Sequence, residues 1–312
     1  MFEVKRYSPE MACEWNQFVA QSKNATFLFD RRYMDYHSDR FADHSLMVYH
    51  RHRLYALLPG NVKDDTFHSH QGLTYGGLII DYRATADGVC ETFLSINEYL
   101  RQAGIRHVVY KPVPHIYHQM PAEEDLYALF VRCGARLTQR DVSSTIELDH
   151  RLRFAESRRS GLRKAHHEGL VVQESHDLEA FWQVLTDNLR LCYGAHPVHQ
   201  LSEMQLLKAR FPENIRLFMV TDHHQQPIGG TLLYLTPQVV HTQYISASPE
   251  GKKLGALDLL FDSLLAMEWH RRYFDFGTSA QEISCEVNSS LLFQKLGFGG
   301  RAVCYDRYHY DL

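Results

Sequence analysis

The chain has 312 residues, of which 45% are hydrophobic and 22% are charged, and its formal net charge is −4. This composition is typical of a globular protein with one large or two ordinary domains. The negative charge argues against broad affinity for DNA or for an anionic membrane. No apolar run is long enough to predict a membrane span, which takes about 18 residues or more.

The cysteines and histidines indicate the cellular compartment and limit the possible metal sites. Six scattered cysteines form no Cys-x-x-Cys motif, and the amino-terminus lacks the apolar core of a signal peptide, so we expect a cytoplasmic protein with reduced thiols. Two histidine pairs, His68 with His70 and His196 with His199, could start a metal site. Neither pair has further ligands nearby in the sequence, so we predict no bound metal.

Alternating helix and strand patterns fill the first half of the chain. They predict helices at 11–21, 88–102 and 123–133 and strands at 45–50, 53–58, 74–81, 105–110 and 144–148. Inside the strand at 74–81, the run Tyr75-Gly76-Gly77 is unusual. Paired glycines in an apolar strand indicate either a bulge or the close approach of a backbone or a ligand. Tyr75 and Gly76 are therefore candidate substrate-binding residues, with a structural bulge as the alternative.

A polar and basic segment at 150–169 separates the two halves. Its composition predicts a helix, and its positive charges are concentrated at Arg158, Arg159, Arg163 and Lys164. Arg159 and Arg163 are candidates for a clamp that binds a phosphate or carboxylate group of a substrate. The alternative is a charged linker helix that only faces solvent.

The second half repeats the element order of the first. Its patterns predict a helix at 178–191, a hairpin at 216–221 and 227–236, strands at 239–247 and 273–277, and helices at 254–269 and 288–298. Phe130-Val-Arg-Cys-Gly134 also aligns with Phe293-Gln-Lys-Leu-Gly297. We therefore predict an α/β fold of two tandem units at 1–149 and 170–312, joined by the linker at 150–169. Each unit would have a mixed central sheet flanked by helices, and coincidence of ordinary α/β patterns is the alternative.

The loop at 248–253 leads from a strand into a helix and carries Lys252 and Lys253. Free backbone N–H groups and the positive end of the helix dipole would point there together, which favours an anion. The corresponding loop of the first half, 81–88, is net acidic. The sequence therefore predicts an anion site in the second unit only.

This strand, loop and helix resemble the cofactor-binding half of the GNAT superfamily of N-acyltransferases, in which the turn holds the pyrophosphate of acyl-CoA. The family pattern Arg/Gln-x-x-Gly-x-Gly/Ala falls on Lys252, Gly255 and Leu257, and Leu257 departs from it. The segment 288–298 is similar to the family helix Asn…Tyr-x-Lys-Leu-Gly-Phe. There Phe293 stands at the position of a tyrosine general acid, and a phenyl ring has no proton to give.

The linker sequence Arg163-Lys-Ala165 and the segment Phe274-Asp-Phe-Gly-Thr-Ser279 resemble the Fem family of peptidoglycan aminoacyltransferases. They are still more similar to its FemAB-like or BioF2-like acetyltransferase-domain relatives. The resemblance implies acetyl-CoA or another acyl-CoA as a co-substrate, with no tightly bound cofactor, and adds Ser279 as a candidate substrate ligand. The implied acyl-CoA site comprises Ser246, Ser248, Gly251, Lys252, Lys253, Gly255, Ala256 and Asn288.

Acyl transfer to an amine needs a base that removes an ammonium proton and donors that stabilise an oxyanion. The candidate catalytic residues are Glu282, Asp275 and Tyr244, with His241 as a further alternate. Glu282 lies in the loop that follows the strand of Asp275, where sites on α/β sheets usually form. Burial would raise the pKa of Asp275, or its carboxylate would instead hold the next loop.

Three functions remain open from the sequence. The first is an acyl-CoA-dependent N-acyltransferase that acts on a small or peptide-like amine. The second is a Fem-like transfer of an amino acid from charged tRNA to a peptidoglycan precursor. It is disfavoured because it calls for a basic surface, and because the chain has no room for the long helical arm that such enzymes often carry. The third is a non-catalytic binding protein that retains the fold, which Phe293 and Leu257 both fit.

Overall fold

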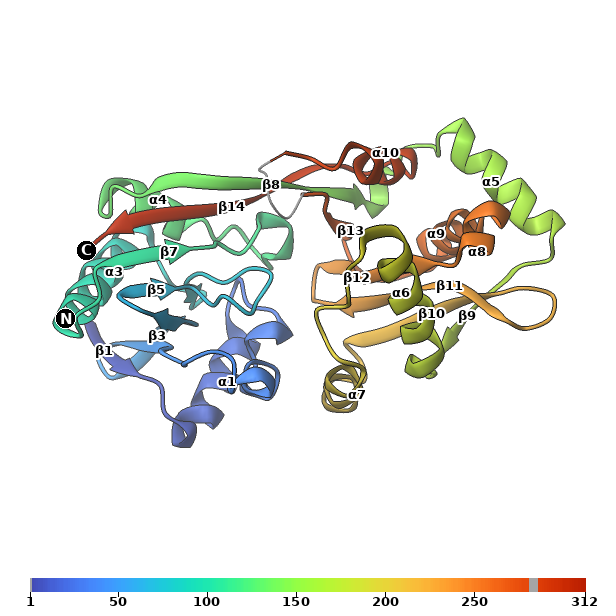
Figure 1. Ribbon diagram of the computed structural model, residues 1–312. Coiled ribbons are helices and arrows are strands. Elements are labelled where there is room, and N and C mark those ends of the chain that lie inside the picture. The colour runs from blue at the N-terminus through green and yellow to red at the C-terminus, as the bar shows by residue number, and fades with distance from the viewer. Residues whose placement is uncertain (1, 281–285) are drawn as a thin grey trace. The chain divides into compact units, whose positions relative to one another are not determined.

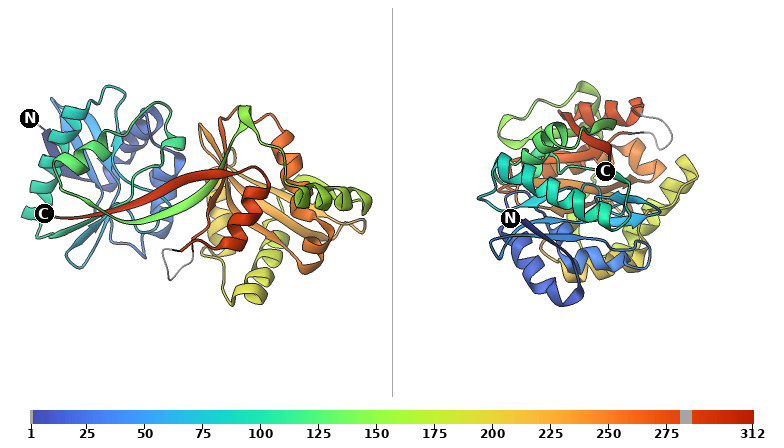
Figure 2. Two further views of the ribbon diagram at one scale, coloured as in Figure 1. Left: turned by 90° about the horizontal axis from the view of Figure 1, so that it is seen from above. Right: turned by 90° about the vertical axis from the view of Figure 1, so that its left-hand side faces the viewer.

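The chain forms two compact units in the computed structural model, which describes residues 2–280 and 286–312 (Figure 1). The first unit comprises Met1–Asp141 and Cys304–Leu312, and the second comprises Val142–Val303. Both ends of the chain therefore belong to the first unit, as the labels N and C show in Figure 2.

These boundaries differ from the predicted ones at 149 and 169. Two long strands, β8 (Arg136–Glu147) and β14 (Arg301–Asp311), are neighbours in the sheet and run side by side in Figure 1. The carboxyl-terminal half of β14 pairs with β7 (His107–Tyr110), which returns the end of the chain to the first unit. The segment predicted as a separate linker belongs to the second unit, because its helix α5 (Glu156–His167) packs there.

The first unit combines two sheets with helices. One sheet has the order β1-β2-β3-β6, and the remaining strands follow the order β4-β5-β7-β14-β8. The helices are α1 (Ala12–Gln21), α2 (Arg31–Met34), α3 (Ala86–Gln102) and α4 (Glu124–Val131). The other strands of this unit are β1 (Phe2–Arg6), β2 (Leu46–His50), β3 (Arg53–Leu58), β4 (Asn61–Lys63), β5 (Thr66–His68) and β6 (Ile79–Ile80).

Helix α3 shows how the sequence builds the core of this unit. Thr85 caps the helix by accepting a hydrogen bond from the Gly88 N–H at 3.2 Å. Its apolar residues recur with helical spacing, so that Val89, Phe93 and Ile96 form one buried stripe against the strands. The predicted helix at 88–102 is therefore confirmed, with its start moved to the cap.

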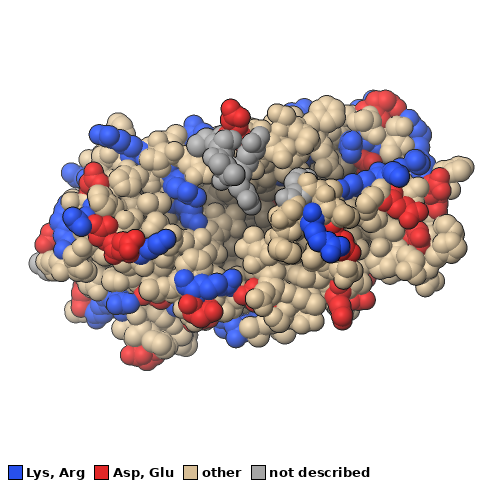
Figure 3. Space-filling view, in the orientation of Figure 1, with Lys and Arg blue, Asp and Glu red and all other residues tan. Residues whose placement is uncertain are grey.

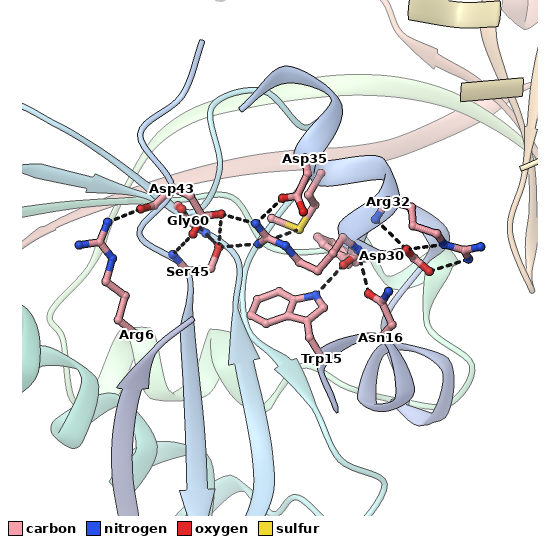
Figure 4. Close-up of polar contacts among 12 residues, drawn as sticks. Arg6, Trp15, Asn16, Asp30, Arg32, Asp35, Asp43, Ser45 and Gly60 are labelled. Carbon is pink, nitrogen blue, oxygen red and sulfur yellow. Dashed lines mark hydrogen bonds and ion pairs between the residues drawn. The ribbon is translucent and has the colours of Figure 1, made fainter. Parts of the chain in front are cut away.

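A buried arginine network holds the amino-terminal segment onto the strands (Figure 4). The Arg31 side chain donates to Asp35, to Asp43 at 2.8 Å and to the Ser45 hydroxyl at 3.4 Å. Its guanidinium also lies 3.8 Å from the ring centroid of Tyr7. Burial alone would lower the pKa of Arg31, but the charges of Asp43 and Asp35 raise it overall, so the guanidinium stays charged.

Replacing Arg31 with Met is expected to destabilise the protein by about 2–3 kcal/mol. The change leaves Asp35 and Asp43 without their shared cation, and their partial exposure keeps the cost below that of a fully buried pair. Urea denaturation at pH 7 measures the effect. Arg32→Met is the matched control, because the Arg32 side chain is exposed and its ion pair with Asp30 lies at the surface, and it should change stability by less than about 1 kcal/mol. Equal losses in the two variants would contradict the structural role of Arg31.

The second unit has the strand order β8-β13-β12-β11-β10-β9. Its helices pack on these strands around a core that includes Phe261, Phe274 and Phe298. Further helices are α6 (Leu178–Tyr193), α7 (Leu201–Arg210), α8 (Pro249–Leu254), α9 (Ala256–Ala266) and α10 (Ser289–Gly297). The strands are β9 (Val171–Ser175), β10 (Ile215–Thr221), β11 (Pro227–Leu235), β12 (Val239–Ala247) and β13 (Tyr273–Thr278).

Three predicted elements differ from the structure. The strand at 74–81 contracts to Ile79–Ile80, and the strand at 144–148 begins already at Arg136. The helix at 254–269 ends at Ala266 and is preceded by a separate short helix, because Gly255 adopts a left-handed conformation with φ of +80°. Within the described ranges, no helix is both long and apolar enough to cross a membrane.

Candidate functional site

Strands β12 and β13 pair over only part of their length. The parallel register joins Val239 to Tyr273, Val240 to Phe274 and His241 to Asp275, and no later pair is formed between the two strands as described. β12 nevertheless continues to Ala247 and β13 to Thr278. Gly277 in β13 has a left-handed φ of +72°, and the register with β8 shifts between Asp275 and Thr278. The two strands therefore separate beyond His241 and Asp275.

A cavity of about 250 Å³ lies between the separated strands. Most of its lining is apolar, and its polar groups come from different elements. Of the predicted acyl-CoA residues, the cavity brings together Ser246, Lys252 and Asn288. The full lining is Asn188, Leu189, Ile245, Ser246, Ala247, Lys252, Leu257, Phe261, Phe276, Asn288, Leu291, Gln294, Lys295 and Phe298.

The predicted anion loop is largely helical. Ser248 caps α8 by accepting from the Gly251 N–H at 3.0 Å, and its own N–H donates to the Ile228 carbonyl. Gly251 is buried, and a Cβ there would lie 2.2 Å from the Ile228 carbonyl oxygen. Lys252 and Lys253 are exposed on the last turn of α8, and Lys252 Nζ donates to Asn188 Oδ1 at 2.5 Å. The two lysines thus sit beside the cavity on a short rigid turn.

Gly255 and Ala256, at the start of α9, lie against the helix that the sequence analysis assigned to a linker. A Cβ on Gly255 would lie 2.3 Å from the Gly161 carbonyl oxygen of α5. Arg158 of α5 donates a hydrogen bond to Asp258 of α9 at 3.0 Å. Burial raises the pKa of Asp258 by more than the charge of Arg158 lowers it. Glycine at 255 is therefore explained by helix packing as well as by its backbone angles.

The predicted arginine clamp lies on the exposed face of α5. Arg159 and Arg163 both pair with Glu156, at 2.5 and 2.8 Å. Arg159 also lines a separate cavity of about 700 Å³ in the second unit. The sequence analysis placed Arg158 in the basic cluster but did not foresee that its side chain turns inward. The helical spacing of Arg158 from Gly161 and Leu162, which face α9, could have predicted this direction.

His241, which is partly buried, pairs with the buried Asp275 where the two strands part. His241 Nδ1 lies 2.9 Å from Asp275 Oδ2, and Asp275 is 0% exposed. Ser143 and Thr145 of β8 donate to Asp275 Oδ1 at 2.5 and 2.8 Å. Burial alone would raise the pKa of Asp275, but His241 and the two hydroxyl donors lower it to about 2. The raised pKa that burial predicts for Asp275 is therefore wrong, and its carboxylate is ionised.

Lys295 of α10 is buried at the other side of the cavity, with 4% exposure. Its ammonium donates to the carbonyl oxygens of Gly277 and Thr278, each at 2.8 Å. Burial lowers the pKa of Lys295 to about 8, partly offset by the charge of Asp275. The sequence alone favours a surface position for Lys295, because helical periodicity did not show that it faces inward, and its burial corrects that expectation.

Tyr244 belongs to a different cluster. Its hydroxyl lies 2.7 Å from His199 Nδ1, accepts from the His199 N–H at 3.2 Å, and its ring packs edge-on against Trp182. Burial raises the pKa of Tyr244. The structure therefore places Tyr244 beside α6 and the segment before α7, and it is not among the residues that line the cavity.

The other predicted residues of the second unit lie in or near the segment after β13. Glu282 lies outside the described residues. Ser279 is fully buried, and its carbonyl oxygen accepts a hydrogen bond from the Asn288 N–H at 2.7 Å. Asn288 caps α10. Phe293, at the position of the family tyrosine, is 66% exposed on α10.

Tyr75 and Gly76 are packed within the first unit. Tyr75 is 3% exposed, its hydroxyl lies 3.1 Å from Thr26 Oγ1, and its ring contacts Tyr117. A Cβ on Gly76 would lie 1.8 Å from the Ser69 carbonyl oxygen. The close approach that the paired glycines permit is thus to another part of the backbone.

One group of potential metal ligands was not foreseen. In the part of the chain that the structure describes, His107, His309 and Asp311 have ligand atoms within 4.8 Å of one another. His107 and Asp311 are cross-strand partners and are hydrogen-bonded at 2.7 Å. The predicted histidine pairs are not part of this group.

Known proteins resemble this chain in part of its sequence and in its fold. Residues 151–282 match the acetyltransferase (GNAT) domain. The whole chain is similar in structure to FemX, with a TM-score of 0.69, 13% identity and coverage of 99% of this chain and 97% of that chain. It is also similar to L-PGS from Bacillus licheniformis, with a TM-score of 0.62, 13% identity and coverage of 98% and 92%. No curated protein matches the sequence.

A tandem GNAT protein from the clavulanic acid biosynthesis pathway has the same arrangement. Its TM-score is 0.53 at 14% identity, with 100% of this chain and 98% of that chain covered. These likenesses confirm the predicted α/β tandem fold. Residues 151–282 match the acetyltransferase (GNAT) domain, and the chain as a whole has a fold similar to that of FemX and of a tandem GNAT protein.

Proposed function

We propose that the protein is an acyl-CoA-dependent N-acyltransferase that acts on a small or peptide-like amine, and that its second unit binds the acyl-CoA. The observation that carries this proposal is the cavity between the separated ends of β12 and β13. Where two strands separate, their facing backbone N–H and C=O groups have no partner strand. The amides of an extended pantetheine arm can hydrogen-bond to these groups, as an added strand would.

The phosphate end of the cofactor would lie at the lysines of α8. Lys252 borders the cavity, and Lys253 extends the positive charge along the same turn. Both ammonium groups can donate to pyrophosphate oxygens. The first turn of α9 adds N–H groups, although α5 packs against Gly255 and limits how closely a phosphate can approach there.

His241 is the proposed general base. Asp275 holds the Nδ1 side of the ring, which fixes the orientation of the imidazole, and we assign the proton transfer to Nε2. The ammonium of the acceptor would lose its proton to Nε2, and the amine nitrogen would then attack the thioester carbon. Asp275 acts through His241 as a positioning residue.

The leaving thiolate needs a different partner from the usual tyrosine, because Phe293 cannot donate a proton. Lys295 lines the same cavity, and its pKa of about 8 is close to that of a thiol. The amine proton leaves through the base, the C–S bond breaks, and the ammonium of Lys295 stabilises or protonates the departing sulfur. Water is the alternative proton source.

Calorimetric titration with CoA tests the cofactor site. The double variant Lys252→Met/Lys253→Met should weaken CoA binding about 10–100-fold, because it removes two charge-assisted contacts to phosphate. Lys63→Met, which removes an exposed lysine of the first unit, is the matched control and should bind as the parent does. A substitution at Gly255 would be a poorer test of CoA binding, because a side chain at this position would also disturb the contact with α5. Parental affinity in the double variant would contradict the site, and a parent that does not bind CoA would contradict the function.

The likeness to FemX keeps a Fem-like aminoacyl transfer as the second candidate. On the face shown in Figure 3, basic and acidic side chains are interspersed, which offers no broad basic surface for tRNA. Binding of charged tRNA without binding of CoA would favour this second function. CoA binding without thiol release, across a panel of amines, would favour a binding protein that retains the fold.

A further inference from the structure

The first unit contains a pocket whose charged side chains are all basic. Its volume is about 430 Å³, and it lies on the strands β5, β7, β8 and β14 and the segment after β5. The lining residues are His68, Ser69, Gln71, Val109, Lys111, Thr138, Arg307 and His309. No aspartate or glutamate contributes to this lining within the ranges 2–280 and 286–312.

Strand register explains why these side chains gather. His68 pairs with Val109, which also pairs with His309, so these three residues form one row across the sheet. The opposite face of the same strands carries Phe67, Val108 and Tyr310, which are buried in the core. Because side chains alternate along a strand, Lys111 and Arg307 follow two residues further on the open face.

The two strong cations of the pocket lack carboxylate partners. Lys111 Nζ donates to the Leu73 carbonyl oxygen at 2.5 Å, and no ion pair of Lys111 or Arg307 is found among the described residues. Burial and the nearby charge of Arg307 lower the pKa of Lys111 to about 7. Burial, followed by the charges of Lys111, Arg307 and Lys63, also lowers the pKa of His68. The fold thus gathers basic groups whose charged forms disfavour one another, and a bound anion would favour those charged forms.

We propose that this pocket binds a small anionic molecule, whose phosphate or carboxylate group lies between Lys111 and Arg307 and beside the two histidines. Arg307 offers a planar set of N–H donors, and Lys111 offers an ammonium held in place by Leu73. Ser69 fixes this arrangement, since its hydroxyl accepts from the Lys111 N–H at 2.7 Å. The pocket is larger than a phosphate ion, so the rest of the molecule would extend along Val109. This site is separate from the acyl-CoA cavity and does not depend on the proposed function.

Calorimetric titration of the full chain with inorganic phosphate, and in parallel with acetate, tests the site in the presence of EDTA. Arg307→Met and Lys111→Met should each weaken binding of the preferred anion at least about tenfold. Arg301→Met is the matched control, because it removes an exposed arginine of the same strand that does not line the pocket, and it should leave the affinity unchanged. Arg307 is exposed, so its replacement tests the site even where Lys111→Met unfolds the protein.

A second set of measurements separates this pocket from the acyl-CoA site. Phosphate binding should persist in Lys252→Met/Lys253→Met, and the bound anion should raise the pKa of Lys111 as followed by NMR of the lysine side chains. Stronger binding of phosphate than acetate would identify a phosphorylated ligand, and the reverse a carboxylate. Phosphate and acetate binding that is absent, that is unaffected by Arg307→Met, or that is lost only with Lys252 and Lys253 would overturn the proposal.

Discussion

Replacing Asp275 with Asn is expected to lower the free energy of unfolding by about 3–5 kcal/mol. The carboxylate is fully buried and accepts hydrogen bonds from Ser143 and Thr145 while it pairs with His241. An amide of the same shape loses the charge and turns one acceptor into a donor, which leaves hydroxyl donors without a proper partner. Urea denaturation at pH 7 measures the loss, with Asp39→Asn as the control at an exposed aspartate.

The stability loss in Asp275→Asn is expected to depend on pH. The pKa of Asp275 is lowered to about 2, below the value near 3.9 of an unfolded aspartate. A carboxyl with a depressed pKa stabilises the fold above the unfolded pKa, and this contribution disappears as the pH falls through the folded pKa. The stability difference between parent and Asp275→Asn should therefore be full at pH 5–7 and shrink from about pH 4 towards pH 2. A difference that is independent of pH would show that the ionised form is not what stabilises the fold.

Replacing His241 with Gln is expected to reduce kcat/KM about 10²–10⁴-fold, the usual cost of losing a general base. The affinity for CoA should stay near that of the parent, because the proposed role of His241 is to accept a proton from the acceptor amine and not to hold the cofactor. Thiol release from acetyl-CoA in the presence of an accepted amine measures the rate. His270→Gln, at an exposed position, is the control.

The pH profile distinguishes catalysis by His241 from a structural effect. In the parent, kcat/KM should fall on the acid side, because a base that already carries a proton cannot accept one from the acceptor ammonium. In His241→Gln that limb should vanish, whereas a merely destabilised enzyme would keep it. In Asp275→Asn the limb should move, since Asp275 sets the tautomer of the ring. Parental activity in His241→Gln would remove His241 from the mechanism and return attention to Glu282.

Local patterns were enough for much of the fold. The apolar stripe of α3, its cap at Thr85 and the hairpin of β2 and β3 all follow from residues within a few positions of one another. The same holds for α6 and for the strand and helix that flank the acyl-CoA cavity. These features depend on short-range periodicity and capping, which a single sequence carries in full.

The α/β class and the tandem order of elements follow from the sequence alone, as does the segment that contains the proposed acyl-CoA cavity. Which distant groups meet depends on the tertiary structure, because burial and charge are set by neighbours far apart in the chain. Asp275 shows this: its own segment predicts a raised pKa through burial, yet Ser143 and Thr145, about 130 residues away, help to lower it. Arg158 reaches Asp258 across 100 positions, and Lys111 meets Arg307 only because β14 returns beside β7. Pairing between strands is set by the packing of whole sheets, so no local pattern could have placed these charges together.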